Sequence, residues 1–359
     1  MSYLNSDVVD SSDLTPQFVG DCLKQQGIEM QVSAINLTPM NNQGRQSHLQ
    51  HLEVQSEDGE SIWLVCKEIG EVSLMNQGAI EDGAFERECH MYRLGSDFAG
   101  INMVRCYHSG YKADEPKMLL ILEDLSPKFA GSSEKTRNSY SYAEMVKVVE
   151  ALAQLHGKHW NDPHLNELDW LYDAKTLNDK GPVLKDPHFI PGVLERLSPI
   201  YSEYHQELNN LLLERLYDLA AISFESFALV HGDAHKRNVK IDDAGNVWFI
   251  DWNYAGCGNP GIDLAKLLFN VEQDAPGNVP KVMAHYLQRL QSQGIDLDWD
   301  ELCKMISLGI VRELLTRLFV ANEMTFDEGQ MAAIRRNYDI HAETFARMNV
   351  LDSLKSQLS

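Results

Sequence analysis

Residues 229–251 are the most informative segment of the sequence. They read Leu229-Val-His-Gly-Asp-Ala-His-Lys-Arg-Asn238, continue as Val239-Lys-Ile241 and Asp242-Asp-Ala-Gly245, and end with Val247-Trp-Phe-Ile-Asp251. The two apolar runs flank a turn rich in Asp and Gly, a pattern typical of a β-hairpin. Folding of this hairpin is expected to bring Asn238, at the start of one strand, close to Asp251, at the end of the other. Asp233 lies on the loop just upstream. The sequence therefore predicts three oxygen-bearing side chains around one point.

Oxygen ligands of this kind suit a hard cation such as Mg²⁺, which takes one or two carboxylates and completes its shell with phosphate oxygens and water. Asp233 is then free to accept a proton from an attacking hydroxyl. This division matches the kinase template, in which a loop Asp is the base, while an Asn five residues later and a further Asp bind metal. Asp and Asn also form ordinary turns, but the combined spacing favours the catalytic interpretation.

The rest of the chain is β-rich in its first third and helical afterwards. A helix is expected between Thr15 and Gly27 and another at Ile80–Leu94. Strands are expected at Met30–Val54, Ile62–Lys67, Met103–Tyr107 and Met118–Leu122. Helical patterns follow at Tyr142–Trp160, Val193–Leu219, Pro260–Asn270, Val282–Gln291, Trp299–Ala321 and Gln330–Leu351, whereas Asp162–Pro191 reads as an irregular connection.

This order predicts an α+β fold of two lobes with a cleft between them, the usual place for a ligand. Residues 1–123 are expected to form a small antiparallel-sheet lobe, for which the resemblance described below implies nucleotide binding. Residues 124–359 are expected to form a larger helical lobe, for which it implies catalysis and substrate binding.

Several motifs together resemble the aminoglycoside phosphotransferase and choline kinase superfamily. The first group comprises His231-Gly-Asp-x-x-x-x-Asn238, Ile250-Asp-Trp252 and Gly258-Asn-Pro-Gly-Ile-Asp-Leu-Ala265. Leu122-Glu-Asp-Leu125 and Leu152-Ala-x-Leu-His-x-x-x-Trp160 are most similar to the ecdysteroid-kinase-like branch. The resemblance runs from about Val65 to Leu268. It implies a protein-kinase-like fold and transfer of phosphate from ATP to the hydroxyl of a small molecule.

The resemblance also implies roles for individual residues. Asp233 matches the catalytic base, and Asn238 and Asp251 match the magnesium ligands. Lys67, at the end of a strand, matches the lysine that holds the α- and β-phosphates. Glu88 is similar to the helix glutamate that pairs with this lysine.

Glu86 is a competing choice for the helix glutamate, although Phe85 and Tyr92 favour Glu88. Glu123, Asp124 and Leu125 match the hinge whose backbone groups would hydrogen-bond adenine. The loop Asn41–Ser47 is the counterpart of the phosphate-covering loop, but it contains a single glycine, Gly44.

The neighbouring polar residues are assigned to structure. His231 is interpreted as a hydrogen-bonding brace of the loop, whereas the role of His235 stays open. His156 and Trp160 share a helix face and are expected to pack beneath the catalytic loop. Asp263 is expected to brace the loop after Asp251.

Composition limits the alternatives. The chain has 359 residues, a net charge of −22 and six scattered cysteines. The charge disfavours binding to nucleic acid or anionic membranes, and the cysteines fit a reducing compartment. With no long apolar run and no secretory signal at the N-terminus, the chain is predicted to be cytoplasmic and to lack a membrane partner. Its oligomeric state is left open.

Two rival enzyme classes are rejected. Gly256-x-Gly-x-x-Gly261 resembles a dinucleotide-binding fingerprint, but no second parallel strand follows to complete the β-α-β unit. No Gly-x-x-x-x-Gly-Lys-Ser/Thr run exists, which excludes a Walker-type NTPase. A protein kinase is disfavoured because the chain lacks an Ala-Pro-Glu segment after Asp251.

The sequence thus predicts an ATP-dependent, magnesium-requiring phosphotransferase with an alcohol group as acceptor. The alternative is a catalytically inactive nucleotide-binding regulator on the same fold, which retention of Lys67, Asp233, Asn238 and Asp251 disfavours. The acceptor stays open: the acidic charge suggests a cationic alcohol such as choline or an aminoglycoside, and the branch resemblance suggests a steroid-like or other apolar alcohol.

Overall fold

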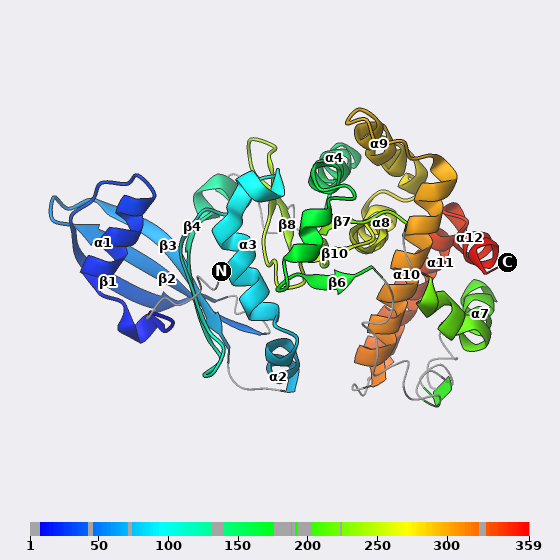
Figure 1. Cartoon of the computed structure of the whole chain (residues 1–359), viewed down its shortest axis with the longest axis horizontal. Helices are drawn as coiled ribbons and strands as arrows, with labels where there is room; N and C mark the ends of the chain where they lie inside the picture. Colours follow the sequence, from blue (N-terminus) through cyan, green and yellow to red (C-terminus); the bar gives the residue numbers. More distant parts are fainter. Residues whose placement is uncertain are drawn as a thin grey trace. The chain divides into compact units, whose positions relative to one another are not determined.

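The computed structural model describes residues 8–41, 46–70, 74–130, 139–175, 188, 191–192, 203–222, 225–322 and 328–358. It divides into two compact units, coloured along the chain in Figure 1. The first unit contains Met1–Ser132 and Asp242–Ala255, and the second contains Ser133–Ile241 and Gly256–Ser359. None of the helices that the structure describes is long and apolar enough to cross a membrane.

The first unit is built on a five-stranded antiparallel sheet in the order β1-β2-β3-β5-β4. The strands are β1 (Val32–Pro39), β2 (Ser47–Ser56), β3 (Ser61–Ile69), β4 (Cys106–Lys112) and β5 (Lys117–Glu123). The expected strand at Met103–Tyr107 begins only at Cys106, because Met103 instead forms an isolated bridge with Phe249. The predicted antiparallel sheet is confirmed.

One face of this sheet packs on helix α1 (Pro16–Gln25), which begins where the sequence predicts. The Thr15 side chain accepts a hydrogen bond from the Phe18 N–H (3.2 Å) and caps the helix. The core under α1 takes alternate residues of the strands, as a pleated sheet requires. Its fully buried members are Val19, Leu23, Leu52, Val54, Leu64, Cys66, Leu119 and Ile121.

The opposite face of the sheet carries Lys67, because its side chain alternates with that of Cys66 along β3. On this side the predicted single helix at Ile80–Leu94 is two helices, α2 (Leu74–Glu81) and α3 (Ala84–Ala99). Gly83 separates them with a φ of 70°, a left-handed conformation that glycine adopts at little cost. Residues 42–45 of the predicted phosphate-covering loop lie outside the described residues.

Residues 242–255, assigned to the second lobe by the sequence prediction, pack with the first unit. They include β9 (Val247–Phe249), whereas the preceding strand β8 (Val239–Ile241) belongs to the second unit. Asn102 Nδ2 donates to the Val247 carbonyl (3.1 Å), and the Phe249 N–H donates to the Asn102 carbonyl (3.1 Å). These contacts tie the segment to residues that precede β4.

The second unit is mainly helical. Its helices are α4 (Tyr142–Lys158), α7 (Glu203–Ala221), α8 (Gly261–Asp274), α9 (Val279–Gln291), α10 (Trp299–Asn322), α11 (Glu328–Arg347) and α12 (Val350–Gln357). The helix expected at Gln330–Leu351 ends at Arg347, because Asn349 adopts a φ of 51° and starts α12. Residues 193–202 of the helix expected at Val193–Leu219 lie outside the described residues.

A three-stranded sheet interrupts these helices in the order β6-β10-β7. The strands are β6 (Tyr172–Ala174), β7 (Ala228–Val230) and β10 (Gly256–Gly258). The sequence indicated neither β6 nor β10, because three-residue strands carry too few positions for a periodicity. Gly261, the last glycine of the segment that resembles a dinucleotide-binding fingerprint, is explained by helix packing. A Cβ atom on Gly261 would overlap the Met305 carbonyl, so Gly261 lets α8 lie against α10.

Candidate active site

In the first unit, a buried lysine lies between two carboxylates. Lys67 Nζ is 2.7 Å from Glu88 Oε1 and 2.7 Å from Asp251 Oδ1. Burial by itself lowers the pKa of Lys67, but the charges of Asp251 and Glu88 raise it above its usual value. Burial also raises the pKa of the Glu88 carboxyl, and the adjacent Lys67 ammonium opposes that rise. The lysine therefore stays cationic, as a phosphate-binding residue must.

Glu88, and not Glu86, makes this contact. The Glu88 side chain is fully buried beneath the sheet, whereas the Glu86 side chain is 41% exposed and lies 3.9 Å from His90. Phe85 and Tyr92, which flank Glu88 in the sequence motif, are both buried on the same helix. The apolar face of α3 therefore determines which glutamate reaches the lysine.

The loop that carries Asp251 is held by the same helix. The Asp251 N–H donates to the Tyr92 hydroxyl (3.2 Å), and Arg87 donates to the Asn253 carbonyl (2.6 Å). Asp251 has a φ of 66°, a left-handed conformation that is uncommon outside glycine and concentrates at functional sites. Contacts from α3 and Lys67 keep Asp251 in this conformation.

The predicted hinge residues lie at the end of β5, which Glu123 closes, and directly after it. The Glu123 N–H donates to the Arg105 carbonyl (2.9 Å), and the Glu123 carboxylate lies 3.0 Å from Lys128 Nζ. Asp124 Oδ1 accepts from the Ser126 N–H (2.8 Å). Leu125 then precedes a short 3-10 helix, Ser126–Phe129. The side chains thus shape the turn, and the adenine-binding role of Glu123, Asp124 and Leu125 stays a prediction.

In the second unit, a buried aspartate organises the loop after β7. Asp263, on α8, accepts from the backbone N–H of His231 (2.7 Å) through Oδ2 and from that of Gly232 (2.8 Å) through Oδ1. His156 Nε2 lies 3.1 Å from Asp263 Oδ2, and His156 Nδ1 lies 2.8 Å from the Tyr286 hydroxyl. Burial raises the pKa of Asp263, but its hydrogen bonds and histidine neighbours lower it below the usual value.

Asp263 therefore braces the loop before Asp233, whereas the sequence analysis expected it to brace the loop after Asp251. The difference arises because α8 starts against the end of β7, where two backbone N–H groups need an acceptor. His156 lies beneath this loop, as expected. His231 also has the expected bracing role, since its Nδ1 accepts from the Asp233 N–H (3.2 Å).

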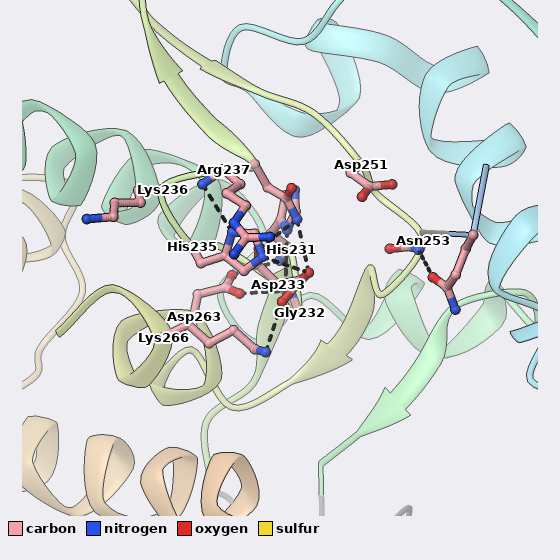
Figure 2. A network of polar contacts seen from close by, with 12 residues as sticks. His231, Gly232, Asp233, His235, Lys236, Arg237, Asp251, Asn253, Asp263 and Lys266 are labelled. Atoms are coloured by element: carbon pink, nitrogen blue, oxygen red, sulfur yellow. Dashed lines mark hydrogen bonds and ion pairs between the residues drawn. The ribbon is translucent and has the colours of Figure 1, made fainter. Parts of the chain in front are cut away.

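Polar groups surround the Asp233 carboxylate (Figure 2). Asn238 Nδ2 donates to Asp233 Oδ2 (3.0 Å) and to the Asp233 carbonyl (3.1 Å). His235 Nε2 lies 3.5 Å from Asp233 Oδ2. Burial lowers the pKa of His235, and the charge of Asp233 opposes this shift. Lys266 Nζ lies 2.9 Å from Asp233 Oδ1 and 3.0 Å from Glu313 Oε2.

Lys266 and Glu313 were not predicted from the sequence. A signal for Lys266 was present, because it lies three residues after Asp263 and so shares its helix face. Glu313 lies on α10 and has no motif around it. Only the packing of α8 against α10 brings these two side chains together.

The predicted metal ligands fit an oxygen-binding cation. Asn238 is buried, and its Nδ2 is occupied by Asp233, so Oδ1 is the atom left for a metal. The Asp251 side chain is 38% exposed. Asn238 belongs to the second unit and Asp251 to the first, and their convergence stays a prediction. The described residues contain no group of three or more His, Cys, Asp or Glu side chains that could hold a metal ion.

Comparison with known families gives one match, to the model of the phosphotransferase enzyme family APH, over residues 125–302. This segment contains Asp233, Asn238, Asp251 and Asp263, whose surroundings are described above. Residues 125–302 are therefore similar to this phosphotransferase family. The predicted recognition of the aminoglycoside phosphotransferase and choline kinase superfamily is thereby confirmed, and the ecdysteroid-kinase-like branch stays a prediction. No curated protein sequence matches the chain.

Solved structures of family phosphotransferases share the fold. A point mutant of aminoglycoside 2'-phosphotransferase-IIIa in complex with GDP is 12% identical, with a TM-score of 0.55, over 93% of this chain and 100% of that chain. The GDP and kanamycin complex of APH(2")-IIia is 11% identical, with a TM-score of 0.51, over 94% and 99%. The predicted α+β, protein-kinase-like fold of the family is confirmed.

Proposed function

We propose that this phosphotransferase is a small-molecule kinase that transfers the γ-phosphoryl group of ATP to the hydroxyl of an alcohol. The observation that carries the proposal is the contact of Lys67 with both Glu88 and Asp251. A buried lysine fixed by a helix glutamate and a loop aspartate is the arrangement that protein kinases use to hold ATP phosphates. In this proposal Lys67 holds the α- and β-phosphates, and Glu88 fixes Lys67.

Asp233 is the proposed base. The acceptor oxygen forms a bond to the γ-phosphorus, and the bond from that phosphorus to the β–γ bridging oxygen breaks, with its electron pair leaving on ADP. The hydroxyl proton passes to the Asp233 carboxylate. The hydrogen bond from Asn238 supports this role, because it orients the carboxylate without occupying all of its lone pairs.

Asn238 and Asp251 are the residues that would hold Mg²⁺. When bound, this ion neutralises charge on the phosphates. Lys67 is already 2.7 Å from Asp251 Oδ1, so a residue of the phosphate site and a residue of the metal site share one ion pair. That arrangement supports a donor that is a nucleotide rather than a simple phosphate ester.

Both the donor and the acceptor classes are to be tested. Two structural neighbours were solved with GDP, so GTP is a competing donor. One of these neighbours was solved with kanamycin, which keeps a cationic alcohol among the acceptors. A steroid-like or other apolar alcohol is the second acceptor class. A small-molecule acceptor, and no nucleic acid or membrane, is the proposed partner.

The test is a screen of the purified chain with ATP or GTP, Mg²⁺ and a panel of cationic and apolar alcohols. Nucleotide diphosphate release is measured together with the mass of the phosphorylated product. Asp233→Asn should lower kcat by about 10²–10⁴-fold, the contribution of a general base, while nucleotide binding stays measurable. Asp296→Asn, an exposed aspartate after α9, is the matched control and should behave as wild type.

A wild-type chain that binds nucleotide but phosphorylates nothing in the panel would support the inactive regulator instead. Unchanged turnover in Asp233→Asn would remove Asp233 from the reaction. Equal loss of nucleotide binding in this variant would indicate a structural defect.

A further inference from the structure

Lys266 contacts the group proposed to accept the proton, and not the backbone around it. Its Nζ atom lies 2.9 Å from Asp233 Oδ1, and the opposite oxygen, Oδ2, accepts from Asn238 (3.0 Å). A carboxylate with a donor on each oxygen cannot rotate freely. Oδ1, which Lys266 contacts, still has a second lone pair for the hydroxyl of an acceptor.

The backbone of the loop is held by other residues. Asp263 accepts from the N–H groups of His231 and Gly232, and the Lys236 N–H donates to Asn270 Oδ1 (3.1 Å). These contacts do not involve Lys266. The ion pair of Lys266 therefore adds orientation of the Asp233 side chain and is not needed to place the loop.

Glu313 keeps the cluster suitable for accepting a proton. Its Oε2 lies 3.0 Å from Lys266 Nζ, and the three side chains are largely buried, with exposures of 16% for Lys266, 18% for Asp233 and 10% for Glu313. One ammonium between two carboxylates leaves a net charge of −1, the same as a lone base. Burial alone lowers the pKa of Lys266, but Glu313 and Asp233 raise it above its usual value, so the ammonium persists.

A purely stabilising role accounts poorly for this arrangement. Taking three charged groups out of water costs free energy that their attraction only partly offsets, so a buried ion pair is weak evidence for stability. Charged groups are retained at such positions where they orient a reacting group. We propose that Lys266 is a positioning residue for phosphoryl transfer, which holds Asp233 through its carboxylate while Glu313 holds Lys266. The proposal rests on the proposed function.

The experiment measures kcat and KM of wild type, Lys266→Met, Lys266→Arg and Glu313→Gln with the best acceptor of the screen. Lys266→Met keeps most of the side-chain stem and removes the charge. It should lower kcat by about 100-fold, the cost of a misplaced reacting group. Its KM for ATP should stay within about twofold of wild type, because transition-state positioning is lost and ground-state binding is not.

Two further variants separate positioning from structure. Lys266→Arg should recover kcat to within about tenfold of wild type, since a guanidinium can bridge two carboxylates. Glu313→Gln should lower kcat by only about tenfold, because the amide oxygen of the glutamine remains a hydrogen-bond acceptor for Lys266. Lys281→Met, at an exposed position of α9, is the matched control and should leave kcat unchanged.

The outcomes are distinct. A kcat of Lys266→Met within twofold of wild type would overturn the proposal. So would parallel losses of kcat, ATP affinity and melting temperature in Lys266→Met, whether or not Lys266→Arg restores them, because they indicate a structural role. A wild-type chain without transfer activity would overturn the proposed function, and this inference with it.

Discussion

Each unit of the molecule contains a buried lysine between two carboxylates. In the first unit Lys67 lies between Glu88 and Asp251, and in the second Lys266 lies between Asp233 and Glu313. The two clusters differ in the surroundings of the aspartate, which is Asp251 in the first unit and Asp233 in the second. Asp251 is 38% exposed and has a left-handed backbone, whereas Asp233 is 18% exposed and has donors on both oxygens.

This difference shows that the same ionic arrangement can serve two purposes. An exposed aspartate beside a fixed lysine can take part in binding a phosphate–metal complex. A more enclosed aspartate, oriented by a lysine and an asparagine, is suited to accept a proton from a bound hydroxyl. Predictions on the two lysines and their partners therefore test whether the clusters are functionally distinct.

Among the further variants, the largest effect on catalysis is expected for Lys67→Met. Removal of the phosphate-holding charge should lower kcat/KM by about 10³-fold, the upper range for loss of one preorganised electrostatic contact. In contrast to Lys266→Met, nucleotide affinity should also fall, as measured by titration calorimetry with ATP. If Lys67→Met and Lys266→Met changed ATP affinity equally, the two clusters would not be functionally distinct. Lys281→Met is again the control.

Asp263→Asn should produce the largest loss of stability. The substitution removes a buried charge and turns one acceptor of a loop N–H into a donor, at a cost of about 3 kcal/mol. Urea unfolding measures this change in the free energy of unfolding, with Asp296→Asn as control. A loss below about 0.5 kcal/mol, the range of surface substitutions, would contradict the bracing role.

The same variant has a predictable pH dependence. The pKa of Asp263 is lowered in the folded state. Its contribution to the free energy of unfolding is therefore fully present above the unfolded pKa and is lost as pH falls through the folded pKa. The free energy of unfolding of wild type should therefore exceed that of Asp263→Asn by a constant amount above about pH 4, and by a decreasing amount below it. A difference that grows on acidification would contradict the sign of this shift.

Asp251→Asn should weaken magnesium dependence. Loss of one carboxylate ligand should raise the magnesium concentration for half-maximal activity by about 100-fold. Manganese titration followed by electron paramagnetic resonance measures the same affinity without turnover. A variant with the wild-type metal titration would exclude Asp251 from the metal site.

The smallest effect is expected for a matched pair on α3. Glu88→Gln should lower kcat/KM by about tenfold, because the amide orients Lys67 less firmly than a carboxylate. Glu86→Gln, two residues earlier at a partly exposed position, should be neutral. If Glu86→Gln has the larger effect, the side chain that pairs with Lys67 in the active protein is not Glu88.

Much of the fold followed from local patterns. Thr15 and Pro16 predicted the start of α1, and the apolar periodicity from Tyr142 predicted α4, because capping and amphipathicity depend on neighbours in the chain. The antiparallel sheet of the first unit was also predicted. The strands β6 and β10 were not, because their three-residue lengths are stabilised by pairing with distant segments and by close contacts at glycines.

The family resemblance and the order of sheet and helices could be predicted from the sequence alone. So could the candidate residues Lys67, Glu88, Asp233, Asn238 and Asp251. Those residues lie in motifs whose spacing is a local property of the chain. The fold was needed to show that Asp263 braces the loop before Asp233 and that Lys266, itself held by Glu313, contacts the Asp233 carboxylate. The physical reason is that both depend on how α8 packs against β7 and α10, and such packing joins residues that no local pattern relates.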